Sequence, residues 1–491
     1  MKKSLKFNML LNILRSLMSL LFPLITFPYI SRVLGTVSLG KINFSSSIAN
    51  YFILFAGLGI STYAVREGAK LRNDKTKFDL FVSQMFSINL GSTIISFICL
   101  IISIFMVNKL QNYIVLIAIY SAQMIFKLIG VEYIYNIYEE YVYITIRGLL
   151  VQVVSVILMF IFVKTEDDAW IYACISVFSA GGAYLFNYYH SRKYCRPHLT
   201  LNIDFRRHIK SILIFFATNL MATIYVSADV TILGFISDDY EVGIYSAAVK
   251  VYTIIKGILA SSVVVSIPQL SEFIAQNKIG KFRTLAEEIH GTLLSLLLPA
   301  CVGLIFLRKE VILIISGTEY IEATACLFWL SIAMIFSLGS YFWGQCILFP
   351  NGKEAYALKI TIITAVINVI LNFIMIPIWG ATGAAISTTI SEFLVLILDW
   401  IGCSTILKAK EINTETLKIV MGCGCIAFVC KGCDIFIENM ILKTVLSGVI
   451  SIVIYGFVEV VLKNNAVTSI MHGLLYYMRR LYKNKGKDYS M

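Results

Sequence analysis

Residues 20–70 read LLFPLITFPYISRVLGTVSLGKINFSSSIANYFILFAGLGISTYAVREGAK, and this stretch decides the fold. Two apolar segments lie on either side of a short turn that contains Gly35 and Gly40, and each segment ends in an arginine, Arg32 or Arg66. A helix that crosses a bilayer needs about 20 mostly apolar residues. The stretch therefore predicts a hairpin of two membrane-spanning helices.

The rest of the chain repeats this pattern. Of its 491 residues, 58% are hydrophobic and 14% are charged, whereas a soluble domain carries roughly 25% charged residues. We therefore predict an all-α polytopic membrane protein. Fourteen apolar segments are expected, near residues 9–31, 42–65, 80–107, 112–135, 142–163, 169–189, 211–236, 242–270, 290–315, 322–349, 355–377, 380–402, 416–433 and 441–462.

Positive residues predict the orientation of these helices. Lys and Arg in short loops are retained on the cytoplasmic side of the membrane. Five follow the second segment (Arg66, Lys70, Arg72, Lys75 and Lys77) and six follow the sixth (Arg192, Lys193, Arg196, Arg206, Arg207 and Lys210). Both termini are accordingly expected to be cytoplasmic. The net charge of +12 lies mostly in these loops, where anionic lipid headgroups attract it, so it does not indicate a nucleic-acid partner.

The opening hairpin also carries a family resemblance. Its Pro23 and Pro28 pair, its PYISRVLG run at 28–35 and its GLGISTYAVRE run at 57–67 resemble the Wzx-type oligosaccharide flippases. These belong with MurJ-like lipid II flippases and MATE exporters in one transporter superfamily, the MOP superfamily. The resemblance implies a MATE-like arrangement of two six-helix lobes, a place in the bacterial cytoplasmic membrane, and transport by alternating access.

An internal duplication supports this arrangement. LGKINFSSSI around Gly40 is similar to VGIYSAAVKV around Gly243, and the segment after Arg147 is similar to the segment after Lys359. The two pairs are 203 and 212 residues apart, and transporters are often built from such repeats. The expected parts are an N-terminal lobe (1–195), a C-terminal lobe (205–405), two appended helices (415–463) and a basic cytoplasmic tail (464–491).

Charges inside the membrane are expected to mark the substrate site. A charge at bilayer depth is costly and usually faces a cavity or another protein group, and the embedded cations outnumber the embedded acids. The resemblance implies a polyprenyl-diphosphate-linked sugar as cargo, held in a cationic central cavity. On this analogy the diphosphate is expected to contact Arg15, Arg32, Lys250 and Lys256. Each cation has the alternative of pairing with a nearby acid, and Arg32 has the alternative of anchoring the outer turn.

A second set of residues suggests ion coupling. Asp229 on the seventh segment, Asn368 and Asn372 one turn apart on the eleventh, and Thr388 on the twelfth carry oxygens that could bind one small cation. Sodium-dependent relatives look similar, but the position of Asn372 is expected to be acidic in them. The asparagines could instead hydrogen-bond between helices, and Asp229 could pair with Lys250 or carry a proton. The coupling ion is therefore left open between Na⁺ and H⁺.

Neither a catalytic site nor a metal site is expected. Cys423, Cys425, Cys430 and Cys433 have zinc-like spacing, but they lie in one apolar segment, and a helix cannot bring all four thiolates together around a metal. We therefore predict a non-enzymatic flippase that translocates undecaprenyl-diphosphate-linked oligosaccharide repeat units for capsule or O-antigen polysaccharide. A polysaccharide polymerase and assembly proteins are possible partners. The alternatives are a cation-coupled multidrug exporter and, less favoured, a membrane-embedded polysaccharide polymerase.

Overall fold

The computed structural model describes residues 5–404, 406, 413–464 and 467–468, with side chains from residue 22 onward in those ranges except 413–414. The described residues form helices joined by short loops, and no strand occurs among them. The chain divides into two compact units. Unit 1 comprises 1–247, 315–320 and 369–384, and unit 2 comprises 248–314, 321–368 and 385–491.

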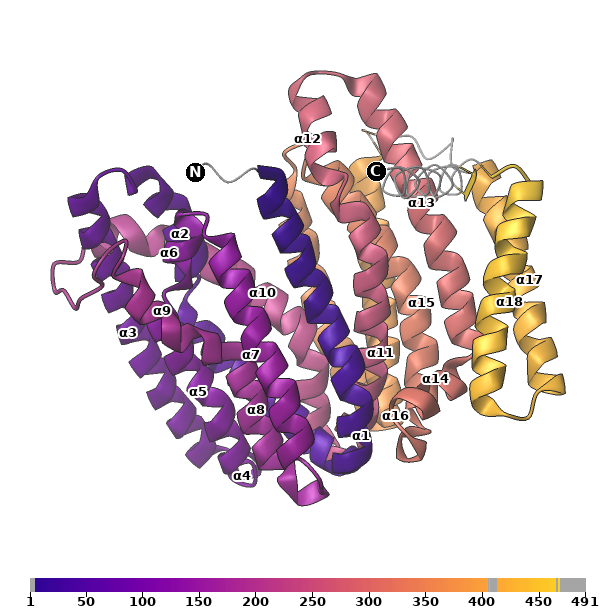
Figure 1. Cartoon of the computed structure of the whole chain (residues 1–491), viewed down its shortest axis with the longest axis horizontal. Coiled ribbons are helices and arrows are strands. Elements are labelled where there is room, and N and C mark those ends of the chain that lie inside the picture. The colour runs from indigo at the N-terminus through magenta and orange to yellow at the C-terminus, as the bar shows by residue number, and fades with distance from the viewer. Residues whose placement is uncertain (1–4, 405, 407–412, 465–466, 469–491) are drawn as a thin grey trace, which may run out of the picture. The chain divides into compact units, whose positions relative to one another are not determined.

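Unit 1 is built mainly from the first ten α-helices (Figure 1). They are α1 (Leu5–Gly57), α2 (Ile60–Leu71), α3 (Lys75–Met106), α4 (Asn108–Gln111), α5 (Ile114–Gly130), α6 (Glu132–Ile137), α7 (Tyr141–Phe162), α8 (Ala169–Gly181), α9 (Leu185–Ser191) and α10 (Phe205–Ile236), with short 3-10 helices at Glu166–Asp168, Gly182–Tyr184 and Thr318–Tyr320.

The predicted opening hairpin is present in unit 1. α1 consists of two helices that meet at Gly35, where the backbone angles are φ 70° and ψ 176°. An L side chain rarely adopts such a φ, and a Cβ here would lie 3.2 Å from Glu319 Oε2, so glycine suits the reversal. Within the described part of α1, Gly35 is the one non-helical position, and the helix continues through Pro23 and Pro28.

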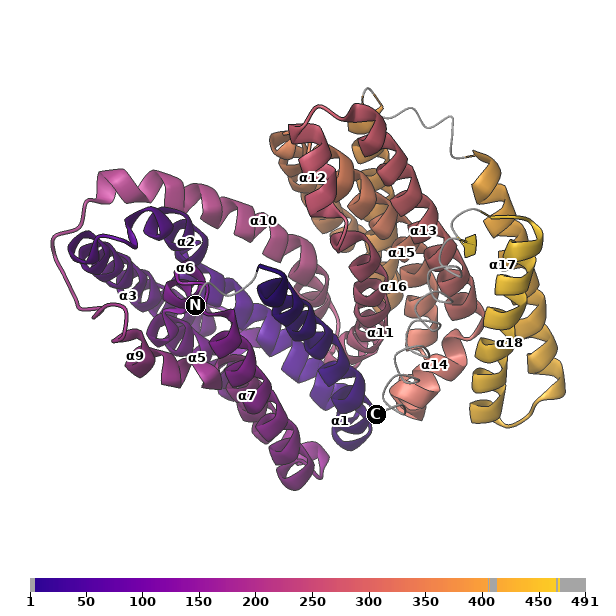
Figure 2. The ribbon, with the colours of Figure 1, turned by 45° about the horizontal axis from the view of Figure 1, so that its top comes forward.

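Unit 2 contains most of α11 (Asp239–Val264) and most of α16 (Glu354–Cys403), which also contribute residues to unit 1. Its remaining helices are α12 (Ile267–Ala275), α13 (Ile279–Phe306), α14 (Arg308–Ile315), α15 (Ala323–Phe342), a π-helix at Trp343–Leu348, α17 (Asn413–Phe436) and α18 (Met440–Val461). α16 consists of two helices that meet at Gly380, with φ 54°. α17 and α18 lie side by side (Figures 1 and 2), and Tyr455 on α18 donates to the Ser295 carbonyl on α13 at 2.8 Å.

Gly40 and Gly243, the two glycines of the expected repeat, each lie against the backbone of the other's segment in unit 1. A Cβ on Gly40 would clash with the Asp239 carbonyl, and a Cβ on Gly243 would clash with the Thr36 carbonyl. Gly40 follows the Gly35 reversal, and Gly243 lies in the first turns of α11, so each glycine lets the other segment's backbone approach. The expected duplication and the lobe boundaries at 195–205 and 405–415 remain predictions.

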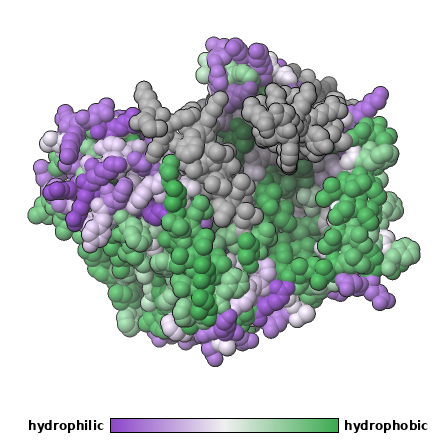
Figure 3. All heavy atoms as spheres, viewed as in Figure 1, coloured by the Kyte–Doolittle hydropathy of each residue, from purple (hydrophilic) through white to green (hydrophobic). Residues whose placement is uncertain are grey.

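The helices are long and apolar enough to cross a membrane. Among the described residues, 11 candidate spans qualify, and the shorter apolar helix Ile114–Gly130 accompanies them. Two of the candidates, Phe22–Leu71 and Glu354–Cys403, are 50 residues long and contain the reversals at Gly35 and Gly380. The predicted all-α polytopic membrane fold is confirmed, while the count of fourteen remains a prediction. Figure 3 shows hydrophobic side chains over the middle of each unit and hydrophilic side chains near the helix ends.

Candidate functional site

Asp229 lies in a polar cluster inside unit 1. Its Oδ1 accepts a hydrogen bond from the Asn372 amide at 2.5 Å, and its Oδ2 accepts one from the Tyr245 hydroxyl at 2.6 Å. Asp229 is 6% exposed and Asn372 is fully buried. The cluster thus joins α10, α11 and α16. A buried carboxylate needs such donors, because an uncompensated charge in an apolar interior is very costly.

The structure brings together two of the four residues proposed for ion coupling. Asp229 and Asn372 are in contact, whereas Asn368 is buried one turn earlier on α16 and Thr388 is half-buried beyond the Gly380 reversal. The predicted alternative, an interhelical hydrogen bond from an asparagine, is therefore realised at Asn372. Sequence reasoning missed Tyr245, because nothing distinguishes it among the 27 tyrosines of the chain.

Lys256 lies in a second polar cluster, within unit 2. Its Nζ is 3.5 Å from Glu392 Oε1 and donates to the Tyr252 hydroxyl at 3.1 Å. The Ser337 hydroxyl on α15 also donates to Glu392 Oε1, at 2.8 Å. About two turns further along the same face of α16, Asp399 Oδ2 accepts from the Ser340 hydroxyl at 2.6 Å. Lys256 is thus paired with an acid, which was the alternative to its proposed role as a surplus cation.

The other three cations proposed for the diphosphate have different surroundings. Lys250 is half-buried on α11, six residues before Lys256, and also takes part in interactions within the protein. Arg32 is exposed, and its Nη1 donates to the Pro28 carbonyl at 2.7 Å and the Ile315 carbonyl at 3.5 Å. This contact agrees with the alternative that Arg32 anchors the outer turn. The side chain of Arg15 lies outside the described residues.

Comparisons with known proteins identify the family. The model of the family described as "Polysaccharide biosynthesis protein" matches residues 5–274, which is more than half of the chain. This chain belongs to the polysaccharide biosynthesis protein family. The resemblance inferred from the opening hairpin is thereby confirmed.

Several named proteins are similar to this chain, two of them over most of their own length. A putative O-antigen transporter of Escherichia coli (strain K12) is 27% identical over 77% of this chain and 91% of its own length. The capsular polysaccharide biosynthesis protein CapF of Staphylococcus aureus is 26% identical over 81% of this chain and 98% of its own. A probable low-salt glycan biosynthesis flippase, Agl15 of Haloferax volcanii, is 29% identical over 34% of this chain.

Solved transporters share the fold of this polysaccharide biosynthesis family member. The lipid II flippase MurJ in an inward closed conformation superposes with a TM-score of 0.75, covering 95% of this chain and 99% of MurJ at 16% identity. An inward-facing multidrug resistance MATE family transporter of the MOP superfamily gives 0.60, over 82% of this chain and 99% of its own, at 15% identity. The predicted MATE- and MurJ-like fold is confirmed.

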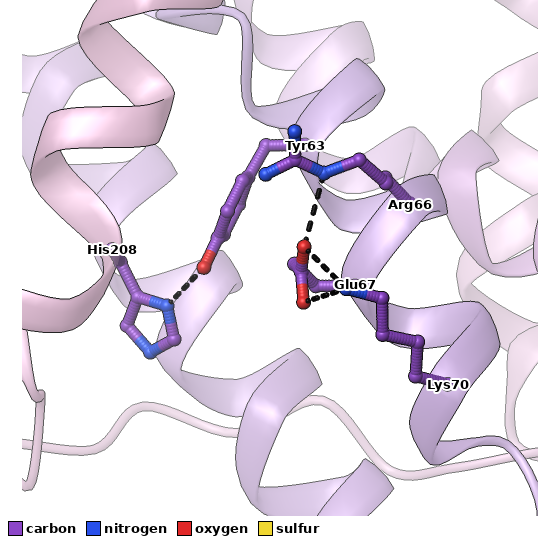
Figure 4. A network of polar contacts seen from close by, with 5 residues as sticks. All are labelled: Tyr63, Arg66, Glu67, Lys70 and His208. Carbon is purple, nitrogen blue, oxygen red and sulfur yellow. Dashed lines mark hydrogen bonds and ion pairs between the residues drawn. The ribbon is translucent and has the colours of Figure 1, made fainter.

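The amino end of α10 is tied to α2 by a histidine in this family member. The Tyr63 hydroxyl shares a hydrogen bond with His208 Nδ1 at 2.7 Å (Figure 4), and His208 Nε2 is 3.0 Å from Gln84 Oε1 on α3. Tyr63 is 3% exposed, so its ring is enclosed by the protein. One turn further along α2, Glu67 pairs with both Arg66 and Lys70, at 3.0 and 2.9 Å (Figure 4).

Proposed function

We propose that this protein is a flippase that translocates undecaprenyl-diphosphate-linked oligosaccharide repeat units across the bacterial cytoplasmic membrane, for capsule or O-antigen polysaccharide. One observation carries the proposal. A chain of the polysaccharide biosynthesis family is built almost entirely of helices that can cross a membrane, in the fold of a solved flippase. The names of the O-antigen and capsular relatives support the same cargo class.

Alternating access is the mechanism that this architecture favours. Transporters of repeated halves usually expose one central site to each side of the membrane in turn. The positive loops that follow the second and sixth predicted segments support an orientation with both termini in the cytoplasm. The cargo would then be collected from the inner leaflet, where it would meet the cytoplasmic ends of the helices, and released at the outer leaflet to a polymerase and assembly proteins.

The cationic residues would hold the diphosphate. Arginine binds phosphate oxygens through a planar fork, and lysine acts as a mobile point charge. We assign this contact to Arg15, Arg32, Lys250 and Lys256. Because Lys256 is held by Glu392 and Tyr252, a diphosphate would have to share or displace that ion pair. This exchange would couple cargo binding to a rearrangement of α11, α15 and α16 in unit 2.

The Asp229 cluster would carry the coupling ion, Na⁺ or H⁺. Carboxylate, amide and hydroxyl oxygens of Asp229, Asn372 and Tyr245 are the hard ligands that such a cation prefers. Asn368 and Thr388 would complete the set on α16. In the arrangement described here the carboxylate is instead satisfied by two donors from the protein, so loading a cation would require the Asn372 amide to turn its oxygen toward the ion.

A multidrug exporter of the same superfamily shares the fold, so the fold does not distinguish the two functions. The family match favours the polysaccharide pathway. A deletion strain provides the test in cells. Loss of the protein should leave lipid-linked oligosaccharide at the inner leaflet and abolish the surface polymer, and expression of the chain should restore both. Normal surface polymer in the deletion strain, with no related flippase present, would contradict the proposal.

A further inference from the structure

A polar cavity lies inside unit 1, apart from the Asp229 and Lys256 clusters. Its volume is about 240 Å³, below the roughly 300–1,000 Å³ of pockets that hold drug-sized ligands, so it suits a single small ring. Asn89 on α3 and Asn219 on α10 each line it, 14 residues after the start of their helices. At about 1.5 Å per residue both lie some 21 Å along the helix, which is deep in the membrane-spanning region.

Two helix breaks adjoin the cavity, because Gly59 and Glu132, which line it, lie at them. The chain leaves the helical conformation at Leu58 and Gly59, between α1 and α2, and again at Val131, between α5 and α6. Val131 has φ 34° and ψ 39°, an unusual conformation for a β-branched residue. Strained backbone of this kind tends to cluster at functional sites. Irregular backbone at membrane depth is tolerated where it lines a cavity.

The lining offers hydrogen-bond donors and acceptors together. The donors include the Lys127 ammonium and the first-turn N–H groups of α2, which has Gly59 at its N-cap and no capping side chain. Glu132 supplies carboxylate acceptors, and Asn89 and Asn219 supply both kinds of group. The rings of Tyr133 and Tyr184 add aromatic surface. A carboxylate beside the ammonium disfavours a free anion such as phosphate, whereas sugar hydroxyls both donate and accept.

The polar groups of the lining differ in how far a guest could reach them. Tyr133 is 3% exposed and lines the cavity, and its hydroxyl has no hydrogen-bond partner among the described residues. Buried polar groups are nearly always hydrogen-bonded. The side-chain amides of Asn89 and Asn219 also make no hydrogen bond within the part of the chain that the structure describes. The amides of the half-buried Asn89 and the exposed Asn219 are thus free for one guest, whereas the Tyr133 hydroxyl has almost no accessible surface and would be reached only if its ring moved.

We propose that this cavity, here named the N-lobe cavity and defined by Asn89, Lys127, Glu132, Tyr133, Tyr184 and Asn219 with the first turn of α2, binds one sugar ring of the carried oligosaccharide. The inference rests on the proposed function, because it takes the lipid-linked sugar as cargo. It assigns recognition of a sugar to unit 1, separate from the cations proposed for the diphosphate. The cavity therefore contributes to the choice among repeat units.

Protection of an introduced thiol tests this site in the full-length protein reconstituted in lipid vesicles. Thr62→Cys places a thiol on the exposed first turn of α2, and its labelling by a small thiol reagent is followed by mass spectrometry of that peptide. The probes are the free oligosaccharide released from the source bacterium's lipid-linked repeat unit, undecaprenyl diphosphate without sugar, and inorganic diphosphate. At about four times its Kd, the oligosaccharide should slow labelling about fivefold, and the two sugar-free probes should not.

Two glycines provide a matched pair of variants. Gly57 lines the cavity and Gly91 does not, and a Cβ added at either would meet no atom within 4 Å. Gly57→Leu should fill the cavity and abolish protection, while Gly91→Leu should preserve it. Asn89→Leu removes one amide of the lining at similar volume and should weaken the apparent affinity for the oligosaccharide about threefold to tenfold, the usual range for one hydrogen bond.

The outcomes separate the cavity from the proposed function. Equal protection by inorganic diphosphate or by undecaprenyl diphosphate would overturn the sugar assignment in favour of an anion or lipid site. Absence of protection by the oligosaccharide, in vesicles that still transport the lipid-linked form, would overturn the N-lobe cavity alone. Absence of transport would instead contradict the proposed function. The labelling assay with the free oligosaccharide would still show whether the N-lobe cavity binds a sugar.

Discussion

The side-chain amide of Asn372 donates a hydrogen bond to Oδ1 of Asp229 at 2.5 Å, which ties α16 to α10 inside unit 1. Asn372→Asp would place two carboxylates in contact, and such a pair cannot remain ionised in a buried site without a cation. We expect this variant to be less stable than the parent in choline chloride and to regain stability as NaCl replaces it. Thermal unfolding at constant ionic strength measures the effect.

The parent protein is the control for this sodium titration. Its Asp229 is already satisfied by Asn372 and Tyr245, so its unfolding temperature should change less with sodium. A sodium effect of the same size in both proteins would show that the ion acts elsewhere.

The Lys256–Glu392 ion pair gives a second prediction. Lys256→Met leaves Glu392, 5% exposed, without its cation. Breaking a buried ion pair costs about 3–5 kcal/mol, and because the Lys256 side chain is 30% exposed we expect the lower end of that range. Lys256→Met combined with Glu392→Gln should recover most of the stability in chemical unfolding.

Transport by the double variant distinguishes the two roles of Lys256. If Lys256 also contacts the diphosphate, the double variant should be stable but transport the lipid-linked oligosaccharide at least about tenfold more slowly, as expected for one lost charged contact. Transport at the parental rate would restrict Lys256 to a structural role.

The Gly40 and Gly243 contacts predict strong intolerance of side chains. Gly40→Val and Gly243→Val would press against the Asp239 and Thr36 carbonyls, and overpacking typically costs about 1–3 kcal/mol. Gly91→Val, which meets open space, should retain parental folded yield and unfolding temperature. Parental stability in either of the first two variants would contradict the close approach of these backbones.

Cys195 should be unreactive in the folded protein. It is 2% exposed in a loop outside the candidate spans. Burial, with a contribution from the charge of Asp79, raises the pKa of its thiol to about 12. The reactive thiolate is therefore scarce at pH 8. Mass spectrometry after maleimide treatment should find Cys195 unmodified in detergent and modified after denaturation in SDS, and fast labelling of the native protein would contradict this packing.

The sequence predicted those features that depend on composition and local pattern. Apolar length predicted the spanning helices, and Gly35 predicted the hairpin reversal. The repeat pattern singled out Gly40 and Gly243, but it did not predict that each would lie against the other segment's backbone. Other features depend on tertiary packing. Lys256 and Glu392 are 136 residues apart in the sequence, so their pairing could be considered only as an alternative.

The helix break at Val131 could not be predicted, because a β-branched residue is not selected for a positive φ. The surrounding structure must impose this conformation. Tyr245 was missed for a similar reason, since its role comes from the position of Asp229 on another helix. The wall of the N-lobe cavity at α5 and α6 was therefore not visible in the sequence.

Transport of lipid-linked oligosaccharide by the purified protein tests the central claim most directly. Vesicles would be loaded with the repeat unit on its undecaprenyl diphosphate carrier, and an added enzyme that modifies only the outward-facing sugar would report its movement between leaflets. The flippase function predicts that the protected inner pool becomes accessible in protein-containing vesicles and stays protected in protein-free ones. Equal accessibility with and without the protein, in vesicles where the chain is folded, would contradict it.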